Sequence, residues 1–211
     1  MNFEKKLLIF VGIATLIFII AGALFFSREK EEQNDQTIDQ AQLIASAKHN
    51  KGNPDAAVKI VEFADFQCPA CKTAFPIVKD IVEKNEQRVF YVYRHFPLTF
   101  HKNSKVAAQA CEAAGEQQKF WEMHDRLYET QESWADSGNA RDIFENYAKD
   151  LGLDIEKFRE DFEASEKIVE LDYSEGNRFG IQSTPTFFIN GKKYPGVISG
   201  SELQSIITNT N

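Results

Sequence analysis

The chain has 211 residues, enough for one domain with its own hydrophobic core and an appended segment. Its formal net charge is −8 and no basic stripe is visible, which argues against a nucleic-acid partner. Three cysteines are too few for a disulfide scaffold, so the core must stabilise the fold.

The N-terminal segment is an uninterrupted apolar run from Leu7 to Phe26. Its length of about 20 residues matches a helix that crosses a bilayer core. Lys5 and Lys6 precede the run and weakly favour a cytoplasmic N-terminus. Ala21-Gly22-Ala23 has the form of a cleavage site, so residues 1–26 are read as a single transmembrane anchor or, alternatively, as a signal peptide. Both readings place the following domain outside the cytoplasm, in the periplasm or at the outer face of the membrane.

Residues 27–52 are polar and charged and predict a tether. Within it, a short helix from Ile38 to Lys48 is expected to dock on the domain. Asn53-Pro54 ends this segment. The sequence therefore predicts a folded domain over residues 53–211.

The domain opens with a strand, a helix and a second strand. Val58 to Phe66 reads as a buried strand, Lys72 to Lys84 as a helix, and Arg88 to Phe96 as a strand rich in β-formers. This spacing predicts a βαβ unit with parallel strands.

A helical stretch follows, and strands return near the end of the chain. Helical spacing of apolar residues predicts an inserted helical subdomain over about 102–178. Thr186 to Ile189 and Lys193 to Val197 read as strands joined by the Asn190-Gly191 hairpin turn. Ser201 is expected to cap a last helix. The predicted α/β order is βαβ, helical insert, ββα.

Cys68 and Cys71 form a CxxC pair where the first strand gives way to the helix. The helix N-terminus offers free backbone N–H groups and partial positive charge, which favour a Cys68 thiolate and make it reactive. A static disulfide and a zinc site are the alternatives, but there is no second CxxC to complete a metal site. Haem attachment is excluded because the residue after Cys71 is Lys72 and not the histidine that such a motif requires.

Several stretches resemble one known family. FADFQCPACK, YRHFPL, AAQACEAAGEQQKFWEMHDRLYE and GIQSTPTFFINGK are similar to bacterial DsbA-like thiol–disulfide oxidoreductases, which are membrane-anchored or secreted. The resemblance covers about Asn53 to Thr208. It implies a thioredoxin fold with an inserted helical subdomain, preceded here by the predicted transmembrane helix.

The resemblance also implies roles for five residues. Cys68 matches the nucleophilic cysteine and Cys71 the resolving cysteine. Pro185 matches the cis-proline that faces the active-site disulfide, with Thr184 beside it. Glu62 stands six residues before Cys68, where the fold often carries a buried acid.

Residues around the cysteines are expected to contact substrate. The candidates are Thr184, Phe66, Pro69 and Ala70, although core packing is an equal alternative for Phe66. Ala70 departs from the strongest oxidant of the family, which has histidine there, so the strength of the couple stays open. The pKa of Cys68 is expected in the lower middle of the range of about 3.5 to 7.5 known for reactive cysteines.

Glu62, His95 and Cys111 each allow two readings. Glu62 is either a buried proton acceptor for Cys71 with a raised pKa, or a strand residue that faces water. His95 either tunes the Cys68 thiolate or is structural. Cys111 is expected to be a buried, inert thiol.

The resemblance favours a dithiol oxidase that introduces disulfides into secreted or envelope proteins. It implies no cofactor beyond the Cys68–Cys71 couple, and reoxidation by a membrane quinone-linked partner of the DsbB type. A reductase or isomerase of the same fold is one alternative. A non-catalytic, anchored peptide-binding chaperone is another.

Overall fold

A computed structural model describes residues 15–16, 18–22 and 38–210. The chain divides into two units, residues 1–37 and 38–211. The predicted anchor from Leu7 to Phe26 lies largely outside the described residues. Within the described ranges, no helix has both the length and the apolar character needed to cross a membrane.

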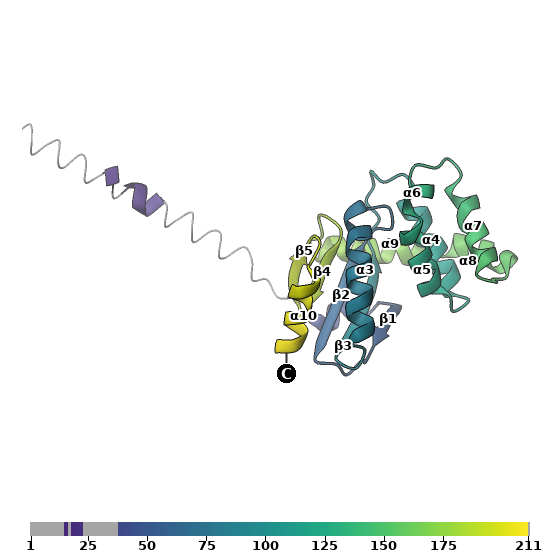
Figure 1. Ribbon diagram of the computed structural model, residues 1–211. Helices are drawn as coiled ribbons and strands as arrows, with labels where there is room; N and C mark the ends of the chain where they lie inside the picture. Colours follow the sequence, from purple (N-terminus) through teal and green to yellow (C-terminus); the bar gives the residue numbers. More distant parts are fainter. Residues whose placement is uncertain (1–14, 17, 23–37, 211) are drawn as a thin grey trace, which may run out of the picture. The chain divides into compact units, whose positions relative to one another are not determined.

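The second unit is built on a five-stranded mixed sheet with the order β1-β3-β2-β4-β5 (Figure 1). β2 and β3 are parallel, as the βαβ prediction requires, and the other neighbouring pairs are antiparallel. The strands are β1 (His49–Gly52), β2 (Val58–Ala64), β3 (Val89–His95), β4 (Thr186–Ile189) and β5 (Lys192–Pro195).

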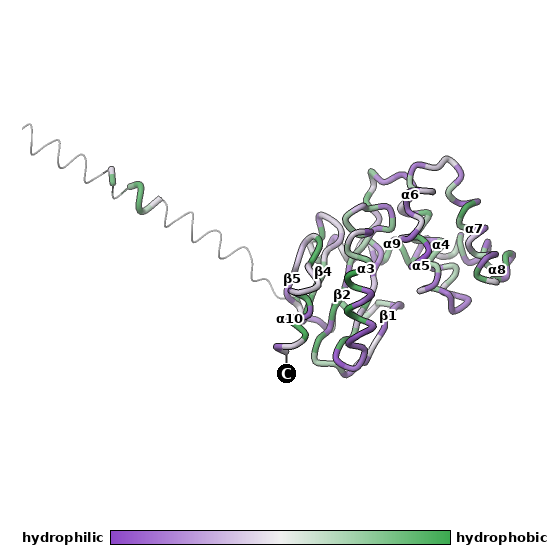
Figure 2. The backbone as a smooth tube through the Cα atoms, viewed as in Figure 1, coloured by the Kyte–Doolittle hydropathy of each residue, from purple (hydrophilic) through white to green (hydrophobic). Residues whose placement is uncertain are grey.

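Both faces of β2 are buried, which explains its nearly continuous apolar sequence. Ile60 and Ala64 belong to a core cluster with α3 (Pro69–Lys84) and α10 (Gly200–Asn209). Val61 and Phe63 belong to a second cluster with residues of α2 (Gln40–Ile44) and α9 (Glu166–Arg178). Figure 2 shows the matching pattern in α3, where hydrophobic and hydrophilic positions alternate along the helix.

The predicted tether boundary at residue 52 is wrong, because the compact unit begins at Ile38. α2 contributes the buried Leu43 to the core, and β1 pairs with β3 at the sheet edge. The predicted docking helix is therefore present, although it ends at Ile44. β1 was missed because an edge strand with alternately exposed, polar residues has the composition of a linker.

Six helices fill the interval where the insert was predicted. They are α4 (Ser104–Gly115), α5 (Phe120–Glu129), α6 (Gln131–Trp134), α7 (Ala140–Asp150), α8 (Ile155–Ala164) and α9. In Figure 1, α4 to α8 form a group beside the sheet. At the last helix, the N-cap is Ser199 and not the predicted Ser201, since the Ser199 side chain accepts from the Glu202 amide.

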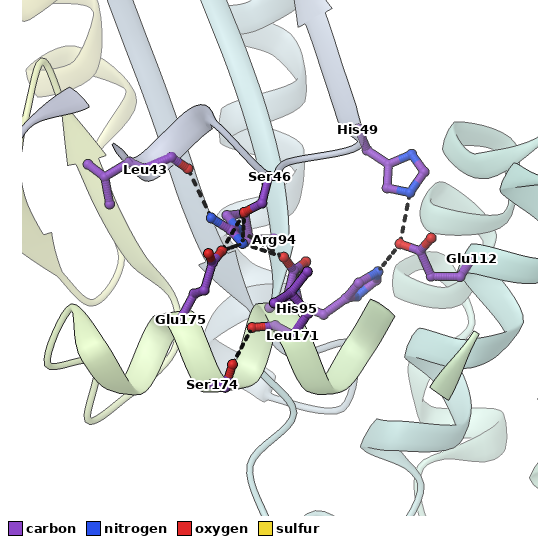
Figure 3. A network of polar contacts seen from close by, with 10 residues as sticks. Leu43, Ser46, His49, Arg94, His95, Glu112, Leu171, Ser174 and Glu175 are labelled. Atoms are coloured by element: carbon purple, nitrogen blue, oxygen red, sulfur yellow. Dashed lines mark hydrogen bonds and ion pairs between the residues drawn. The ribbon is translucent and has the colours of Figure 1, made fainter. Parts of the chain in front are cut away.

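A buried polar network ties α2 to the sheet and to α9 (Figure 3). Arg94 is fully buried at the end of β3 and donates to Asp172 at 2.7 Å, to Glu175, to Ser46 and to the Leu43 carbonyl. Arg94 would be costly to bury without these partners. The network thus fixes the segment that leads into the domain.

A second part of the network surrounds Glu112 on α4. Its Oε1 atom lies 2.8 Å from Nε2 of His49 and 2.9 Å from Nε2 of His95 (Figure 3). These contacts connect β1, β3 and the helical subdomain. They also assign His95 a structural role, because its ring bonds to Glu112 and not to a catalytic thiol.

Candidate active site

Cys68 is the N-cap residue of α3, and Pro69 occupies the first helical position. The backbone of Cys68 is extended, with φ −71° and ψ 123°, and its amide donates to the Asp65 carbonyl at 3.1 Å. Cys71 follows in the first turn. Both cysteines are thiols; Cys68 retains 7% exposure, while Cys71 has none.

The loop before β4 faces Cys68, as the family resemblance implied. The Thr184–Pro185 peptide bond is cis. In its protonated form, the Cys68 thiol donates to the Thr184 carbonyl at 3.4 Å. Because Thr186 pairs with Phe63 near the end of β2, this loop and the CxxC turn meet at the same end of the sheet.

The pKa of Cys68 is lowered from 9.0 to about 5. The largest cause is the hydrogen bond from the Cys71 thiol, while burial acts in the opposite direction and backbone N–H groups of Cys71 and Ala70 add smaller stabilisation. The value lies in the predicted range. However, the backbone N–H groups at the helix N-terminus, which were predicted to favour the thiolate, lower this pKa less than the Cys71 thiol does.

Cys71 has the opposite environment. Burial raises its pKa well above 9.0, and the neighbouring Cys68 and Glu62 raise it further. The backbone amide of Asp65 donates to the Cys71 sulfur at 3.4 Å and favours its thiolate. The two thiols therefore differ strongly in acidity, so Cys68 is the thiolate and Cys71 the proton donor to it.

Glu62 lies in the centre of β2 and is 4% exposed, so its buried reading is correct. Burial raises its pKa from 4.5 to about 7, although the Tyr91 hydroxyl, which donates at 2.5 Å, partly offsets this rise. Glu62 also lines a pocket between β1, α3 and α5, together with Tyr91, Trp121 and His124. A water-accessible volume of about 20 Å³ gives this pocket room for one water molecule.

The predicted substrate contacts fall into two groups. Pro69 is exposed and Ala70 half-buried, so both present atoms beside Cys68. Thr184 is 6% exposed, and its carbonyl reaches Cys68. For Phe66 the core-packing alternative holds and the substrate-contact reading does not, because the side chain is 1% exposed and packs among Tyr93, Tyr128 and other rings.

Cys111 is buried on α4, as predicted. Its thiol donates to the Phe120 carbonyl at 3.4 Å, and burial raises its pKa well above 9.0. Such a thiol is unreactive at neutral pH. Within the described ranges, no group of three or more His, Cys, Asp and Glu side chains is arranged to hold a metal ion.

Three amide side chains that the sequence analysis missed connect the CxxC turn to the helical subdomain. Gln131 donates to the carbonyls of Phe66 at 2.6 Å and Cys68 at 3.1 Å. Gln67 accepts from the Asn103 amide at 2.6 Å and donates to the Ala135 carbonyl at 2.8 Å. The Asn103 side chain in turn donates to three carbonyls near the end of α6.

Comparisons with known proteins agree with this fold. A family model described as Thioredoxin matches residues 44–209. A thioredoxin-like oxidoreductase from Silicibacter pomeroyi superposes with a TM-score of 0.68 at 30% identity, over 81% of this chain and 96% of that one. Oxidised BdbD from Bacillus subtilis superposes with a TM-score of 0.67 at 29% identity, over 79% of this chain and 94% of that one.

A curated relative has a different name. The Na(+)/H(+) antiporter NhaA 1 of Salinispora arenicola is 39% identical over 166 residues, which are 76% of this chain and 24% of the relative. The chain thus spans about a quarter of the length of this curated relative. The ion transport in that name refers to the longer protein.

We expect Cys68 alone to react with iodoacetamide, at a rate that rises through pH 5 and levels off above about pH 7, because its thiolate forms near pH 5. Cys71→Ala removes the largest stabilising hydrogen bond and should raise the pKa of Cys68. Cys71→Ser, which keeps a hydroxyl donor, is the matched control and should stay closer to the wild type. An alkylation midpoint near 9.0 in the wild type would contradict the assignment.

Glu62→Gln should stabilise the reduced protein at alkaline pH. The pKa of Glu62 is higher in the folded state than its ordinary 4.5, so stability is lost as pH rises through about 7. Glutamine carries no charge and still accepts from Tyr91. We expect a gain of about 3 kcal/mol in the free energy of unfolding near pH 8, and none near pH 4, by urea unfolding.

The matched control for this measurement is Glu83→Gln, which changes an exposed glutamate at the same pocket. Its free energy of unfolding should change by less than about 0.5 kcal/mol at both pH values. Equal stability of Glu62→Gln and the wild type near pH 8 would show that Glu62 is not buried as a costly charge.

Proposed function

The chain belongs to the thioredoxin family and is a thiol–disulfide oxidoreductase, and we propose that it introduces disulfides into secreted or envelope proteins. The observation that carries the proposed direction is the lowered pKa of Cys68. A stabilised thiolate favours the reduced enzyme, so the oxidised enzyme gives its disulfide away more readily.

The size of this effect follows from the pKa. At pH 7, a Cys68 thiolate with a pKa of about 5 stabilises the reduced form about fiftyfold relative to one with a pKa of about 7, which is itself half ionised at this pH. For a two-electron couple, this corresponds to about 50 mV toward a stronger oxidant. The couple therefore favours disulfide donation although Ala70 supplies no histidine.

The reaction proceeds in two exchanges. A substrate thiolate attacks the Cys68 sulfur, the Cys68–Cys71 bond breaks, and its electron pair goes to Cys71. A second substrate thiolate then attacks the substrate sulfur of the mixed disulfide, and Cys68 leaves as a thiolate. Two substrate thiols become one disulfide, while the enzyme disulfide is reduced to two thiols.

Glu62 and the Thr184–Pro185 loop are assigned supporting roles in these steps. With a pKa of about 7, Glu62 can give a proton to Cys71 when its thiolate forms, and take one back in the reverse step. Its pocket offers a route for that proton to solvent. The backbone around Thr184, beside the Cys68 sulfur, can pair with an extended substrate as an added strand.

Two exposed apolar side chains support a polypeptide substrate. Within residues 38–210, the large apolar side chains that stay exposed are Phe100, Leu171 and Val197. Val197 follows Gly196, whose amide donates to the Pro185 carbonyl, and Phe100 precedes His101, which bonds to Asp65. Phe100 and Val197 therefore flank the catalytic end of the domain. There they can contact the apolar residues that an unfolded substrate chain exposes.

The location and the partner are also part of the proposal. The apolar run from Leu7 to Phe26 supports a single membrane anchor with the domain outside the cytoplasm. An enzyme that gives away its disulfide must be reoxidised, and we assign this step to a membrane quinone-linked protein of the DsbB type. No cofactor other than the Cys68–Cys71 couple takes part in this scheme.

Equilibration of the full chain with glutathione buffers tests the direction. We expect a reduction potential of about −220 mV or less negative, since the lowered pKa of Cys68 stabilises the reduced form by about 50 mV relative to a thiol with a pKa of about 7. The oxidised fraction is measured by alkylating the free thiols and determining the masses of the products by mass spectrometry. A potential near the value of about −270 mV typical of thioredoxin would instead assign a reductase.

Cys71→Ser should trap disulfide-linked partners through Cys68, because the thiol that reverses the first exchange is missing. Non-reducing gels of cells that express this variant should show adducts that vanish on reduction. Adding Phe100→Ser should reduce these adducts while leaving the reaction of Cys68 with small disulfides unchanged. Partners that persist without any disulfide link would favour a peptide-binding chaperone and contradict the enzyme.

A further inference from the structure

We propose that Asp65 is a positioning residue for Cys71, holding a backbone N–H toward the sulfur that must carry negative charge during exchange. The inference rests on the proposed function in one respect, that Cys71 is the leaving and resolving thiol. It assigns a role to a residue between β2 and the CxxC pair that neither the sequence motif nor the fold comparison identifies.

The Asp65 carboxylate is completely buried and accepts four hydrogen bonds. Its Oδ1 atom accepts from the Gln67 amide at 2.8 Å and from the Ser104 hydroxyl at 2.5 Å. Its Oδ2 atom accepts from the Leu98 amide at 3.0 Å and lies 2.6 Å from Nδ1 of His101. These donors come from the CxxC turn, from the loop after β3 and from the start of α4.

The main chain of the same residue contacts both cysteines. The Asp65 amide donates to the Cys71 sulfur at 3.4 Å, and its carbonyl accepts from the Cys68 amide at 3.1 Å. A side chain held by four donors leaves the adjoining peptide units little freedom to rotate. The carboxylate therefore sets the direction of the N–H group that points at Cys71.

This direction matters because Cys71 has little other help. Its sulfur is fully buried, and the nearby Cys68 and Glu62 further oppose its thiolate. When the Cys68–Cys71 bond breaks, the electron pair moves to Cys71 before Glu62 supplies the proton. In the reverse step, the Cys71 thiolate attacks Cys68 of the mixed disulfide, and the substrate sulfur leaves. An oriented N–H group stabilises the same charge in both directions.

A positioning role predicts that an Asp65 variant slows only the step in which Cys71 reacts. A structural role predicts that the reactions of both cysteines slow. The reduced full-length chain is mixed with excess oxidised glutathione, the reaction is quenched with acid, and the products are identified by mass spectrometry. Cys68 first forms a mixed disulfide with glutathione, and Cys71 then displaces the glutathione. The two phases report the two thiols separately in one experiment.

Asp65→Asn keeps the volume but replaces one acceptor oxygen by an NH₂ group, which then faces other donors. We expect the mixed disulfide to form at a rate within about twofold of the wild type, and to be resolved about tenfold more slowly, as loss of an oriented hydrogen bond to a charged group predicts. Equal slowing of both phases, or no slowing of the second, would overturn the proposal.

Asp172→Asn is the matched control. Asp172 is another buried carboxylate that accepts a backbone amide, that of His95 at 3.0 Å, but it contacts no cysteine. It should lower the free energy of unfolding and leave both phases unchanged. If Asp172→Asn slowed the second phase as much as Asp65→Asn, the effect would be general loosening and the proposal would be wrong.

A milder variant covers the case in which Asp65→Asn does not fold. His101→Ala removes one donor from Oδ2 and should slow resolution about threefold, again without changing formation of the mixed disulfide. An unchanged second phase in this variant would count against the proposal. Failure of the wild type to form either the mixed disulfide or the Cys68–Cys71 disulfide would instead overturn the proposed function itself.

Discussion

The unequal burial of two sulfurs within one helical turn is the constraint on which the site depends. Cys71, in the first turn of α3, is fully buried and stays protonated, so its thiol can donate to Cys68. Cys68 retains contact with solvent and becomes the acidic partner. This difference exists because both faces of β2 are covered, so that water is excluded from the end of the strand where Cys71 lies.

Two carboxylates near this buried end of β2 have environments that suit different tasks. Glu62 accepts a hydrogen bond from Tyr91, and burial brings its pKa close to neutrality, which suits a group that exchanges protons. Asp65 is held by four donors, which suits a group that fixes geometry. The same residue class therefore supplies a mobile proton and a rigid anchor within one short segment.

The sequence predicted those parts of the site that depend on local pattern. Cys68 and Cys71 at a strand-to-helix junction, Thr184-Pro185 before a strand, and Glu62 within an apolar run are all recognisable from neighbours in the chain. Asp65 and Gln131 were missed, because their burial depends on contacts with segments 33 to 65 residues away. Composition carries no signal for such contacts.

The position of Phe66 was left open and β1 was missed, for related reasons. An aromatic residue beside a reactive cysteine fits a core and a substrate surface equally well, and only the packing against Tyr93 and Tyr128 decides. A polar edge strand resembles a linker until its partner, β3, is known. In both cases the missing information is the identity of the neighbour in space.

The first residue of the second unit, Ile38, lies at a defined end of the sheet. The Ile38 amide donates to the Gly191 carbonyl in the β4–β5 turn, next to Asn190, which bonds to Lys59 near the start of β2. Cys68 follows the other end of β2, about 20 Å away for a strand of this length. Ile38, the first residue of the second unit, therefore lies at the end of the sheet opposite the thiols.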